Sequence, residues 1–400
     1  MNILFLASNF PDPVNETWAP WNKRAVDAVL EYANPVVIAP RPFAPPFSKF
    51  FKIPNKGTSY GYPVYYPRFV YLLPKRIFYC ITGKSYEYFV GRFIKKKVGS
   101  GQIEKPDIIH ALHPYLDGYG GVSIAKDLSV PLVVTVHSPN NLKACPKRVL
   151  SVLQNADKVI TVAEFLRTKL IDIGILEEKV EYVSLGVDTR RFRPLDRSDS
   201  MEILRKYDID EEDVVILYVG RLSAEKNLES LVKSVPIILN NAPSEIRRHI
   251  KFVIVGKGPE EKNLRKIVSG LGVGDHVLFV GGLNHNSMEL NVWYGIADIF
   301  VLPSLSEGKP VAVYEAMSSG CAIVASGING ILEQVFEGVN GFLIPPGDVD
   351  TLVTKILYLL DNPKELDRMK KASRELIFKL GYTWDKYRES IKRIYENLGG

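Results

Sequence analysis

The sequence has few cysteines and no long apolar segment, and each scarcity excludes a class of protein. Its 400 residues include three cysteines, Cys80, Cys145 and Cys321. Because they are odd in number and far apart, we expect neither a disulfide-stabilised scaffold nor a cysteine-based zinc module, and we expect a reducing compartment such as the cytoplasm. The first residues lack the charged segment of a signal peptide, and no run approaches the roughly 20 apolar residues of a membrane-spanning helix.

The net charge of +6 is unevenly distributed along the chain. Residues 41–97 contain twelve basic residues, one acidic residue and 16 of the 42 aromatic residues, so this segment carries +11 and the remainder −5. Such a composition is typical of a surface that meets anionic lipid headgroups at a bilayer. A packed insertion with a solvated charged rim explains it as well, and we do not expect nucleic acid as a partner.

Apolar segments alternate with helical patterns twice along the chain. In the first half the predicted strands lie at 3–7, 36–39, 107–110, 132–136 and 156–162, with a helix over 20–33 that buries Ala25, Val26, Val29 and Leu30. In the second half they lie at 214–219, 252–255, 277–280, 299–302 and 323–325, with helices over 227–239, 350–360, 363–380 and 383–398. Strands that are apolar on both faces and separated by helices predict parallel sheets. The sequence therefore predicts two doubly wound α/β domains, with a junction within 187–200.

The most informative segment is residues 303–317, which read PSLSEGKPVAVYEAM directly after a predicted strand. Open α/β sheets bind ligands at the carboxyl ends of their strands, and a glycine-containing turn into a helix presents N–H groups to an anion. Glu307 lies in the turn and Glu315 in the helix. Ionised carboxylates accept hydrogen bonds from hydroxyl groups, so this pair suits a neutral polyol. A helix-capping glutamate beside a surface glutamate is the alternative.

A second segment, residues 220–227, reads GRLSAEKN and follows the predicted strand 214–219. Arg221 and Lys226 place two cations at the carboxyl end of that strand, where they can converge on a diphosphate without a metal ion. Two solvated cations at a helix start are the alternative. His137 ends the strand 132–136, where a lone histidine is more often structural than functional.

Two further patterns carry less weight. His110 and His113 invite a metal interpretation, but their spacing on a strand puts them on opposite faces, so no metal site is expected. Residues 255–261, VGKGPEE, are similar to a dinucleotide fingerprint but lack its third glycine and occur in the second half of the chain. We interpret them as a tight turn rather than an NAD site.

Together these segments resemble glycosyltransferase family 4, the retaining enzymes with the two-domain GT-B architecture. The resemblance covers most of residues 180–400 and, more loosely, residues 1–180. Its markers are Gly186-Val187-Asp188 with Phe192 and Pro194, Gly220-Arg221, Lys226-Asn227, residues 256–259, residues 297–304, Glu307, Glu315-Ala316-Met317, residues 340–343 and Pro346-Gly347-Asp348.

The resemblance implies a cleft between two domains that holds a nucleotide-diphosphate sugar, such as a UDP-sugar or a GDP-sugar, with no cofactor and no metal ion. The acceptor-side domain would comprise residues 1–187 and about 383–400, with the basic segment 41–97 as an insertion. The nucleotide-sugar-binding domain would comprise residues 188–382, and the last helix would cross back onto the first domain.

The resemblance also implies roles for single residues. Arg221 and Lys226 would stabilise the leaving diphosphate, and Glu307 would face the transferred hexose. Glu315 would hold the ribose hydroxyls, and His137 would reach the donor sugar from the first domain. The other donor-binding candidates are Gly220, Gly308, Lys309, Pro310, Val311, Gly282 and Leu283.

Two departures from the family pattern concern these sites. The loop 9–21 lacks the Gly-Gly pair that often approaches the donor phosphate and the acceptor. Its Trp18 and Trp21 either stack on a sugar or pack within the loop, and with His113 they are the acceptor-side candidates. Lys309-Pro310 stands where Phe-Gly is frequent, and Pro310 removes one N–H donor.

The expected activity is therefore retaining transfer of a hexose from a nucleotide-diphosphate sugar to a carbohydrate or lipid-linked acceptor. The expected location is the cytoplasm, with peripheral attachment to the inner face of the membrane through 41–97 as one option. A sugar-nucleotide epimerase of the same architecture, which needs no acceptor, and a non-catalytic sugar-nucleotide-binding protein remain alternatives.

Overall fold

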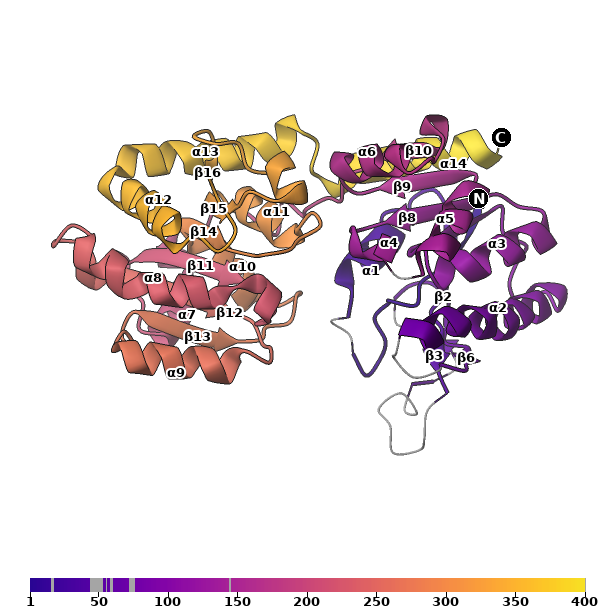
Figure 1. Ribbon diagram of the computed structural model, residues 1–400, viewed down its shortest axis with the longest axis horizontal. Helices are drawn as coiled ribbons and strands as arrows, with labels where there is room; N and C mark the ends of the chain where they lie inside the picture. The colour runs from indigo at the N-terminus through magenta and orange to yellow at the C-terminus, as the bar shows by residue number, and fades with distance from the viewer. Residues whose placement is uncertain are drawn as a thin grey trace. The chain divides into compact units, whose positions relative to one another are not determined.

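A computed structural model describes residues 1–15, 18–43, 53–54, 56–57, 60–71, 76–143 and 145–399, with only the backbone for residues 76–79. The chain divides into two units (Figure 1): unit 1 comprises Met1–Leu185 with Asp385–Gly400, and unit 2 comprises Gly186–Trp384. The expected domain limits at 187 and 383 lie close to these divisions.

Unit 1 is built on an eight-stranded sheet in the order β10-β9-β8-β7-β1-β2-β5-β4. Neighbouring strands are parallel except for the antiparallel pair β4–β5. The strands are β1 (Asn2–Leu6), β2 (Asn34–Ile38), β4 (Lys56–Gly57), β5 (Val64–Tyr65), β7 (Ile108–Ala111), β8 (Leu132–Val136), β9 (Lys158–Thr161) and β10 (Val180–Tyr182), and β3 (Arg41–Pro42) pairs separately with β6 (Arg68–Phe69). Parallel neighbours joined through helices give the doubly wound arrangement that the apolar runs predict.

The helices of unit 1 include the two that the sequence predicts by range, 20–33 and 383–398, and the first of these is shorter than predicted. They are α1 (Pro20–Asp27), α2 (Arg76–Gly99), α3 (Asp117–Leu128), α4 (Asn140–Lys143), α5 (Pro146–Asn155), α6 (Glu164–Asp172) and α14 (Trp384–Gly399). Helix α1 ends at Asp27 instead of continuing to residue 33. The expected inward position of Leu30 is wrong, because its side chain is 43% exposed while Ala25, Val26 and Val29 are buried. Turns after Asp27 rotate Leu30 away from the face that the helical period assigns to it.

Helix α14 is fixed to the sheet of unit 1 by a buried histidine. The Nδ1 atom of His110 on β7 lies 2.6 Å from the hydroxyl oxygen of Tyr395, and its Nε2 atom lies 2.7 Å from Oγ1 of Thr135 on β8. His110 and Tyr395 are both fully buried. Both ring nitrogens of His110 are thus engaged in packing the last helix onto the sheet.

The basic segment 41–97 is partly integrated into the unit 1 core. Its residues 44–52, 55, 58–59 and 72–75 lie outside the described residues. Helix α2 packs against α3 and β6, and several aromatic residues of the segment are buried, namely Tyr62, Tyr65, Tyr66, Phe69 and Tyr86. Part of the aromatic content therefore serves the hydrophobic core, as the packed-insertion alternative expects.

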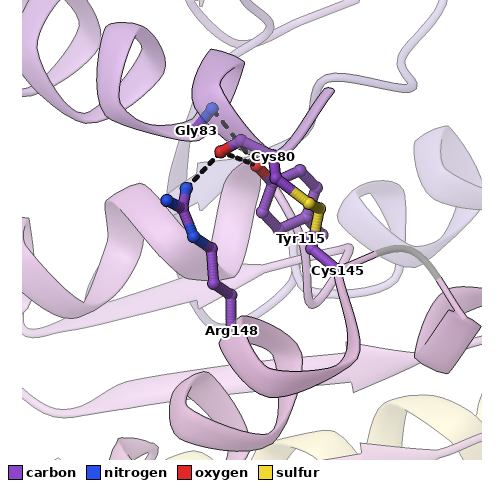
Figure 2. Close-up of a disulfide and its surroundings, with 5 residues drawn as sticks. All are labelled: Cys80, Gly83, Tyr115, Cys145 and Arg148. Carbon is purple, nitrogen blue, oxygen red and sulfur yellow. Dashed lines mark hydrogen bonds between the residues drawn. A yellow bond between two sulfur atoms is a disulfide. The ribbon is translucent and has the colours of Figure 1, made fainter. Parts of the chain in front are cut away.

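A disulfide joins Cys80 on α2 to Cys145, the residue before α5 (Figure 2). The carbonyl oxygen of Cys80 accepts hydrogen bonds from the Tyr115 hydroxyl, at 2.8 Å, and from the Arg148 guanidinium. The sequence did not indicate this disulfide, which the reducing compartment expected from the cysteine count would disfavour. A sequence separation of 65 hid the pairing, because only the fold brings the starts of α2 and α5 together. Cys321 is free and buried.

Unit 2 contains a six-stranded parallel sheet in the order β13-β12-β11-β14-β15-β16 (Figure 1). Its strands are β11 (Val214–Val219), β12 (Ile250–Val255), β13 (Val277–Gly281), β14 (Ile299–Leu302), β15 (Ala322–Ser326) and β16 (Gly341–Ile344). Its main helices are α7 (Met201–Lys206), α8 (Leu228–Asn241), α9 (Glu261–Leu271), α10 (Met288–Ile296), α11 (Val311–Ser318), α12 (Val349–Asp361) and α13 (Pro363–Lys379). The strand order reverses between β11 and β14, which is the position where doubly wound sheets bind ligands.

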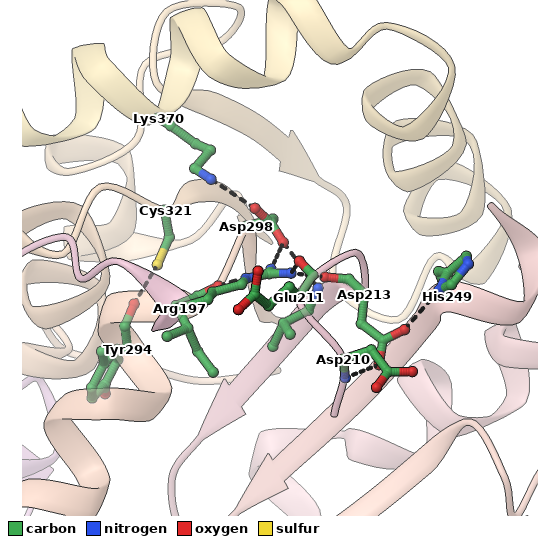
Figure 3. Close-up of polar contacts among 11 residues, drawn as sticks. Arg197, Asp210, Glu211, Asp213, His249, Tyr294, Asp298, Cys321 and Lys370 are labelled. Atoms are coloured by element: carbon green, nitrogen blue, oxygen red, sulfur yellow. Dashed lines mark hydrogen bonds and ion pairs between the residues drawn. The ribbon is translucent and has the colours of Figure 1, made fainter. Parts of the chain in front are cut away.

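The segment that enters unit 2 is tied to the sheet by charged groups (Figure 3). The Asp298 carboxylate, just before β14, accepts from Arg197 and from Lys370 of α13, at 2.7 Å each. It also accepts from the backbone N–H of Val215 at 3.0 Å. These contacts hold the start of β11, the start of β14 and the entering segment together. They therefore fix the two strands relative to each other, including their carboxyl ends.

Candidate functional site

The candidate site lies in unit 2 at the carboxyl ends of β11 and β14, the two strands between which the order reverses. The turn after β11 carries Arg221 and Lys226, and the turn after β14 carries Glu307. The backbone N–H of Leu305 donates to the carbonyl oxygen of Glu225 at 2.8 Å, which joins the two turns directly. The two motifs of the sequence, residues 220–227 and 303–317, therefore meet, although residues 228–302 lie between them.

Glycines let three neighbouring loops of this edge approach closely. The N–H of Gly220 donates to the Val255 carbonyl at 3.0 Å, and that of Gly256 donates to the Gly281 carbonyl at 2.9 Å. A Cβ at Gly256, whose φ is +153°, would collide with the carbonyl oxygen of Gly220. A Cβ at Gly258 would likewise collide with the backbone of Leu222. Close loop packing thus accounts for the glycines of the sequence 256–259.

Arg221 presents its guanidinium to solvent. Its side chain is exposed, and it forms no ion pair with any residue in the described part of the chain. Its carbonyl oxygen accepts a hydrogen bond from the buried Tyr218 hydroxyl at 2.9 Å, which fixes the turn beneath it. Arg221 is thus held by its backbone while its charge remains accessible to an anion.

Lys226 and Glu307 form an ion pair, with Lys226 Nζ 2.5 Å from Glu307 Oε1. The same carboxylate oxygen accepts from the hydroxyl of Ser304 at 2.7 Å, and Ser304 is fully buried. The backbone carbonyl of Glu307 accepts from the Asn329 side-chain amide at 2.7 Å. Sequence reasoning did not identify Ser304 or Asn329, because serine and asparagine near a turn are common and neither is charged.

Lys309, one of the donor-binding candidates, has a buried side chain, which leaves its backbone N–H as the group that can serve that role. The side chain is 1% exposed, and its Nζ atom lies 2.7 Å from Oε2 of Glu333 and 4.9 Å from the centre of the Tyr382 ring. Burial of the aliphatic stem against aromatic rings explains why the ammonium turns inward. Gly308, Pro310 and Val311 remain partly exposed at the start of α11, with Pro310 as the residue before the helix.

Glu315 lies in the second turn of α11 and is almost fully buried. Its Oε1 atom lies 3.6 Å from Nδ1 of His285, in the loop after β13 that also contains Gly282 and Leu283. Burial, and then the nearby Glu315 carboxylate, raise the pKa of the Tyr294 hydroxyl well above its usual range. Sequence reasoning missed His285, which stands in a polar stretch without any recognisable spacing.

In unit 1, His113 and His137 lie together near the carboxyl ends of β7 and β8. Their ring centres are 6.2 Å apart. Asn141 contacts both residues. Its amide nitrogen donates to Nε2 of the His113 ring at 3.3 Å, and its side-chain oxygen accepts from the backbone N–H of His137 at 2.9 Å. Burial lowers the pKa of His113 to about 4 and that of His137 to about 3. Nε2 of His137 is buried and has no hydrogen-bond partner among the residues that the structure describes.

Trp18 and Trp21, the aromatic candidates of the first loop, have different surroundings. The Arg41 guanidinium lies 4.9 Å from the Trp18 ring centre, a contact that packs this half-buried ring within unit 1. Arg41 is fully buried and donates to the carbonyl of Phe10 at 2.6 Å and to the Asp12 carboxylate at 3.0 Å. Trp21 is 39% exposed and remains available to a ligand.

The start of the same loop is held by a buried acid. Asp117 accepts from the N–H and the hydroxyl of Ser8 and, at 2.8 Å, from the Tyr86 hydroxyl. Burial raises the pKa of Asp117 to about 7, although these hydrogen bonds oppose the shift. Charged and polar side chains thus fix this loop, which lacks the expected glycine pair.

Two family models match the chain in succession. The model for glycosyltransferase family 4 matches residues 33–191, and the model for glycosyl transferases group 1 matches residues 199–376. Together they extend over both units.

Similar curated proteins are also glycosyltransferases. The sulfoquinovosyl transferase SQD2 of Arabidopsis thaliana is 35% identical over 295 residues, which are 70% of this chain and 54% of the plant protein. This chain thus spans about half the length of that relative. A D-inositol 3-phosphate glycosyltransferase of Kribbella flavida is 27% identical over 70% of this chain and 68% of its own. A GDP-mannose-dependent phosphatidylinositol monomannoside mannosyltransferase of Mycolicibacterium smegmatis is 29% identical over 55% of this chain and 57% of its own.

Solved structures share the fold over the whole chain. The Anabaena protein HepE in complex with UDP has a TM-score of 0.75 at 19% identity and covers 100% of both chains. A sucrose-phosphate synthase of Thermosynechococcus elongatus has a TM-score of 0.77 at 20% identity, over 100% of this chain and 99% of its own.

Proposed function

Because this chain belongs to glycosyltransferase family 4 and has the GT-B fold, we propose that it transfers a hexose from a nucleotide-diphosphate sugar to a carbohydrate or lipid-linked acceptor. The transfer would retain the configuration at the anomeric carbon and would require neither a metal ion nor another cofactor. The observation that carries the proposal is the ion pair of Lys226 with Glu307 at the switch point of unit 2, with the exposed Arg221 in the same turn as Lys226. Two cations beside a carboxylate suit a ligand that joins a diphosphate to a polyol.

In the proposed reaction the bond between the anomeric carbon and the diphosphate oxygen breaks, and both electrons leave with the diphosphate. The acceptor hydroxyl forms the new bond on the same face of the sugar, and its proton passes to the departing phosphate oxygen. Arg221 and Lys226 stabilise the negative charge that develops on the leaving group. No protein nucleophile is needed, so catalysis rests on positioning and on electrostatic stabilisation.

The other candidates receive roles around these three residues. We assign Glu315 to the ribose hydroxyls and the loop with Gly282 and Leu283 to the base. Gly220 and the start of α11 at Gly308, Pro310 and Val311 would line the donor, with Lys309 contributing only through its backbone. We assign His137 to the donor sugar and Trp21 and His113 to the acceptor. Burial keeps His137 uncharged at neutral pH, so this histidine would act as a hydrogen-bonding group rather than as a cation.

The names of similar proteins support this choice of substrates. HepE was solved with UDP and with UDP-glucose, and the mycobacterial relative is described as GDP-mannose-dependent and as acting on a phosphatidylinositol mannoside. The plant relative is described as a sulfoquinovosyl transferase. These descriptions favour a UDP-sugar or a GDP-sugar as donor and make a lipid acceptor worth testing first.

The solvent face of α2 supports a peripheral attachment to the inner, anionic leaflet of a membrane. Ile81, Lys84, Tyr88 and Arg92 follow one another at helical spacing and are all exposed, Tyr88 to 59%. The ring of the exposed Phe43 packs against that of Phe89 beside them, with their centres 5.8 Å apart. Aromatic and basic side chains on one helical face are typical of contact with headgroups. In the part of the chain that the structure describes, no helix combines the length and apolar character needed to span a bilayer.

The activity is tested with a panel of UDP-, GDP- and ADP-sugars, scored by nucleotide release with and without a crude lipid extract as acceptor source. We expect release from one donor class to rise several-fold when the acceptor is present. Conversion of the donor sugar without any acceptor would favour the epimerase instead. Absence of binding to every nucleotide sugar, measured by thermal shift, would contradict the proposal.

Membrane attachment is tested by co-sedimentation with vesicles of phosphatidylcholine that contain phosphatidylserine as the anionic lipid. Binding should fall as salt is raised and should be lost in the triple variant Lys84→Gln, Arg92→Gln, Lys96→Gln. The matched control replaces three exposed lysines of α13, Lys364, Lys371 and Lys379, by Gln. Equal binding by both triple variants would refute a specific role for α2.

A further inference from the structure

The ion pair between Lys226 and Glu307 joins the two halves of the proposed donor site. Lys226 is assigned to the diphosphate and Glu307 to the hexose, yet their charged atoms lie 2.5 Å apart. The Lys226 side chain is 21% exposed and that of Glu307 is 8% exposed. Lys226 is therefore partly accessible to a ligand, whereas the carboxylate that it contacts is nearly buried.

Glu307 is held at its backbone as well as at its side chain. Asn329 donates to its carbonyl oxygen and Ser304 to Oε1, both at 2.7 Å. The next residue, Gly308, accepts from the N–H of Gly330 at 2.9 Å. A Cβ at Gly330 would lie 2.5 Å from the Gly308 carbonyl oxygen, so the two turns are in close contact. Glu307 is thus a fixed point of the site.

The ammonium of Lys226 has no hydrogen-bond partner other than Glu307 among the residues that the structure describes. A lysine side chain has a flexible four-carbon stem, and fixing it costs up to about 2 kcal/mol in lost rotamer entropy. The contact with the fixed Glu307 removes much of this freedom before a ligand arrives. A positioned charge stabilises a leaving group better than a mobile one, because no reorganisation is needed as the charge develops.

We propose that Glu307 is a positioning residue for Lys226, with Ser304 completing the support, so that both act on the diphosphate in addition to any contact with the hexose. The inference rests on the proposed function. It differs from a role for Glu307 in sugar binding alone, because it predicts an effect on ligands that carry no sugar. Two opposite effects operate: the carboxylate fixes the ammonium, but its negative charge also repels a phosphate.

Glu225 separates these two effects. It precedes Lys226 in the sequence, and its carboxylate accepts a hydrogen bond from the Ser223 hydroxyl at 2.7 Å. Hydrogen bonds lower the pKa of Glu225, and the charges of Arg221 and Lys226 lower it further. It forms no ion pair with Lys226 among the described residues. Glu225→Gln therefore removes a nearby negative charge and leaves the Lys226 anchor in place. If charge alone mattered, Glu225→Gln and Glu307→Gln would both tighten the binding of a diphosphate.

The experiment measures the affinity of UDP, GDP and ADP, which carry no sugar, by titration calorimetry. With the nucleotide that the wild-type chain binds, we expect Glu307→Ala to weaken affinity about tenfold and Ser304→Ala about three- to tenfold. Glu225→Gln should not weaken it. The matched control Ser306→Ala removes an exposed hydroxyl from the same turn and should leave affinity unchanged.

A double-mutant cycle identifies the route of the effect. In a chain with Lys226→Ala, the further change Glu307→Ala should no longer weaken UDP, GDP or ADP binding, because the group it positions is gone. Far-UV circular dichroism and thermal unfolding show which variants are folded, and Ser304→Ala serves if Glu307→Ala is not. Wild-type affinity for the sugar-free nucleotide in folded Glu307→Ala and Ser304→Ala would overturn the inference and leave the proposed function standing. A wild-type chain that binds none of the three nucleotides would overturn both.

Discussion

The Nδ1 atom of His110 lies 2.6 Å from the hydroxyl of Tyr395, although the two residues are 285 positions apart in the sequence. This contact attaches the last helix of the chain to the central strands of unit 1. Both groups are fully buried, so water cannot replace a lost partner. The contact makes the position of α14 sensitive to a single oxygen atom.

We expect Tyr395→Phe to lower the free energy of unfolding by about 1–3 kcal/mol, because it leaves a buried histidine nitrogen without a partner. Urea unfolding followed by circular dichroism measures the change. Tyr88→Phe, at an exposed position of α2, is the matched control and should change stability by less than about 0.5 kcal/mol. Equal stability of Tyr395→Phe and the wild type would show that the hydrogen bond contributes nothing.

Unit 1 should lose stability when the pH falls below 6.5. Burial lowers the pKa of His110 and His137 to about 3 and that of His113 to about 4. In the unfolded chain these histidines titrate near 6.5, so between pH 6.5 and about 4 the unfolded state binds more protons and folding weakens with acidification. Above pH 6.5 each uncharged histidine makes its full contribution to stability. Within the window, each pH unit of acidification lowers the free energy of unfolding by about 1.4 kcal/mol per histidine.

Asp117 acts in the opposite direction. Its pKa of about 7 in the folded chain exceeds the value near 3.8 of a free aspartate, so the folded state binds more protons between these values. The stability that this group contributes therefore rises as the pH falls from about 7 to 4. This gain offsets roughly the loss of stability that one histidine causes over the same range. Urea unfolding at several pH values should show a shallower acid loss for His113→Gln and a steeper one for Asp117→Asn. Identical slopes for the three chains would contradict these pKa shifts.

The disulfide between Cys80 and Cys145 should stabilise unit 1. Closing a loop of this size restricts the unfolded chain, and such links typically contribute about 2–4 kcal/mol. The double variant Cys80→Ser, Cys145→Ser should therefore unfold at a lower temperature than the wild type. Dithiothreitol should lower the wild-type midpoint toward that of the variant and should leave the variant unchanged. A wild-type midpoint that does not respond to dithiothreitol under unfolding conditions would argue against the link.

Arg221→Ala should reduce transfer by roughly two to three orders of magnitude in kcat, as expected when a group that stabilises developing charge is removed. Because Arg221 is exposed and its turn is fixed by Tyr218, thermal stability should change little. Lys266→Ala, which removes an exposed cation of α9, is the matched control for the loss of one positive charge. Full transfer activity in folded Arg221→Ala would remove this residue from the mechanism.

Much of the fold could be read from local patterns. The strands β8, β11 and β14 match the predicted ranges at both ends, because an apolar run bounded by polar residues is a local signal. Helix α1 shows the limit of such a signal: the period assigns Leu30 to the buried face, but the helix ends before that residue. What lies against a face is decided by other parts of the chain.

The sequence was enough to propose the charged residues of the candidate site, but it did not indicate which residues these contact. Arg221, Lys226 and Glu307 stand at strand ends in recognisable segments. The inward turn of Lys309 toward Glu333 depends on the Tyr382 ring, which comes from a distant segment. The pairing of Cys80 with Cys145 likewise depends on how two helices start beside each other.

The sequence by itself determined the succession of strands and helices, because hydrophobic period and turn residues act over a few positions. It also placed each chemical group at the end of a particular strand. Only the tertiary structure decided which of those ends are neighbours. Strand β14 pairs with β11 although β12 and β13 intervene in the sequence, since the sheet is extended on both sides of its first strand. That non-local pairing brings Lys226 to Glu307 and creates the site.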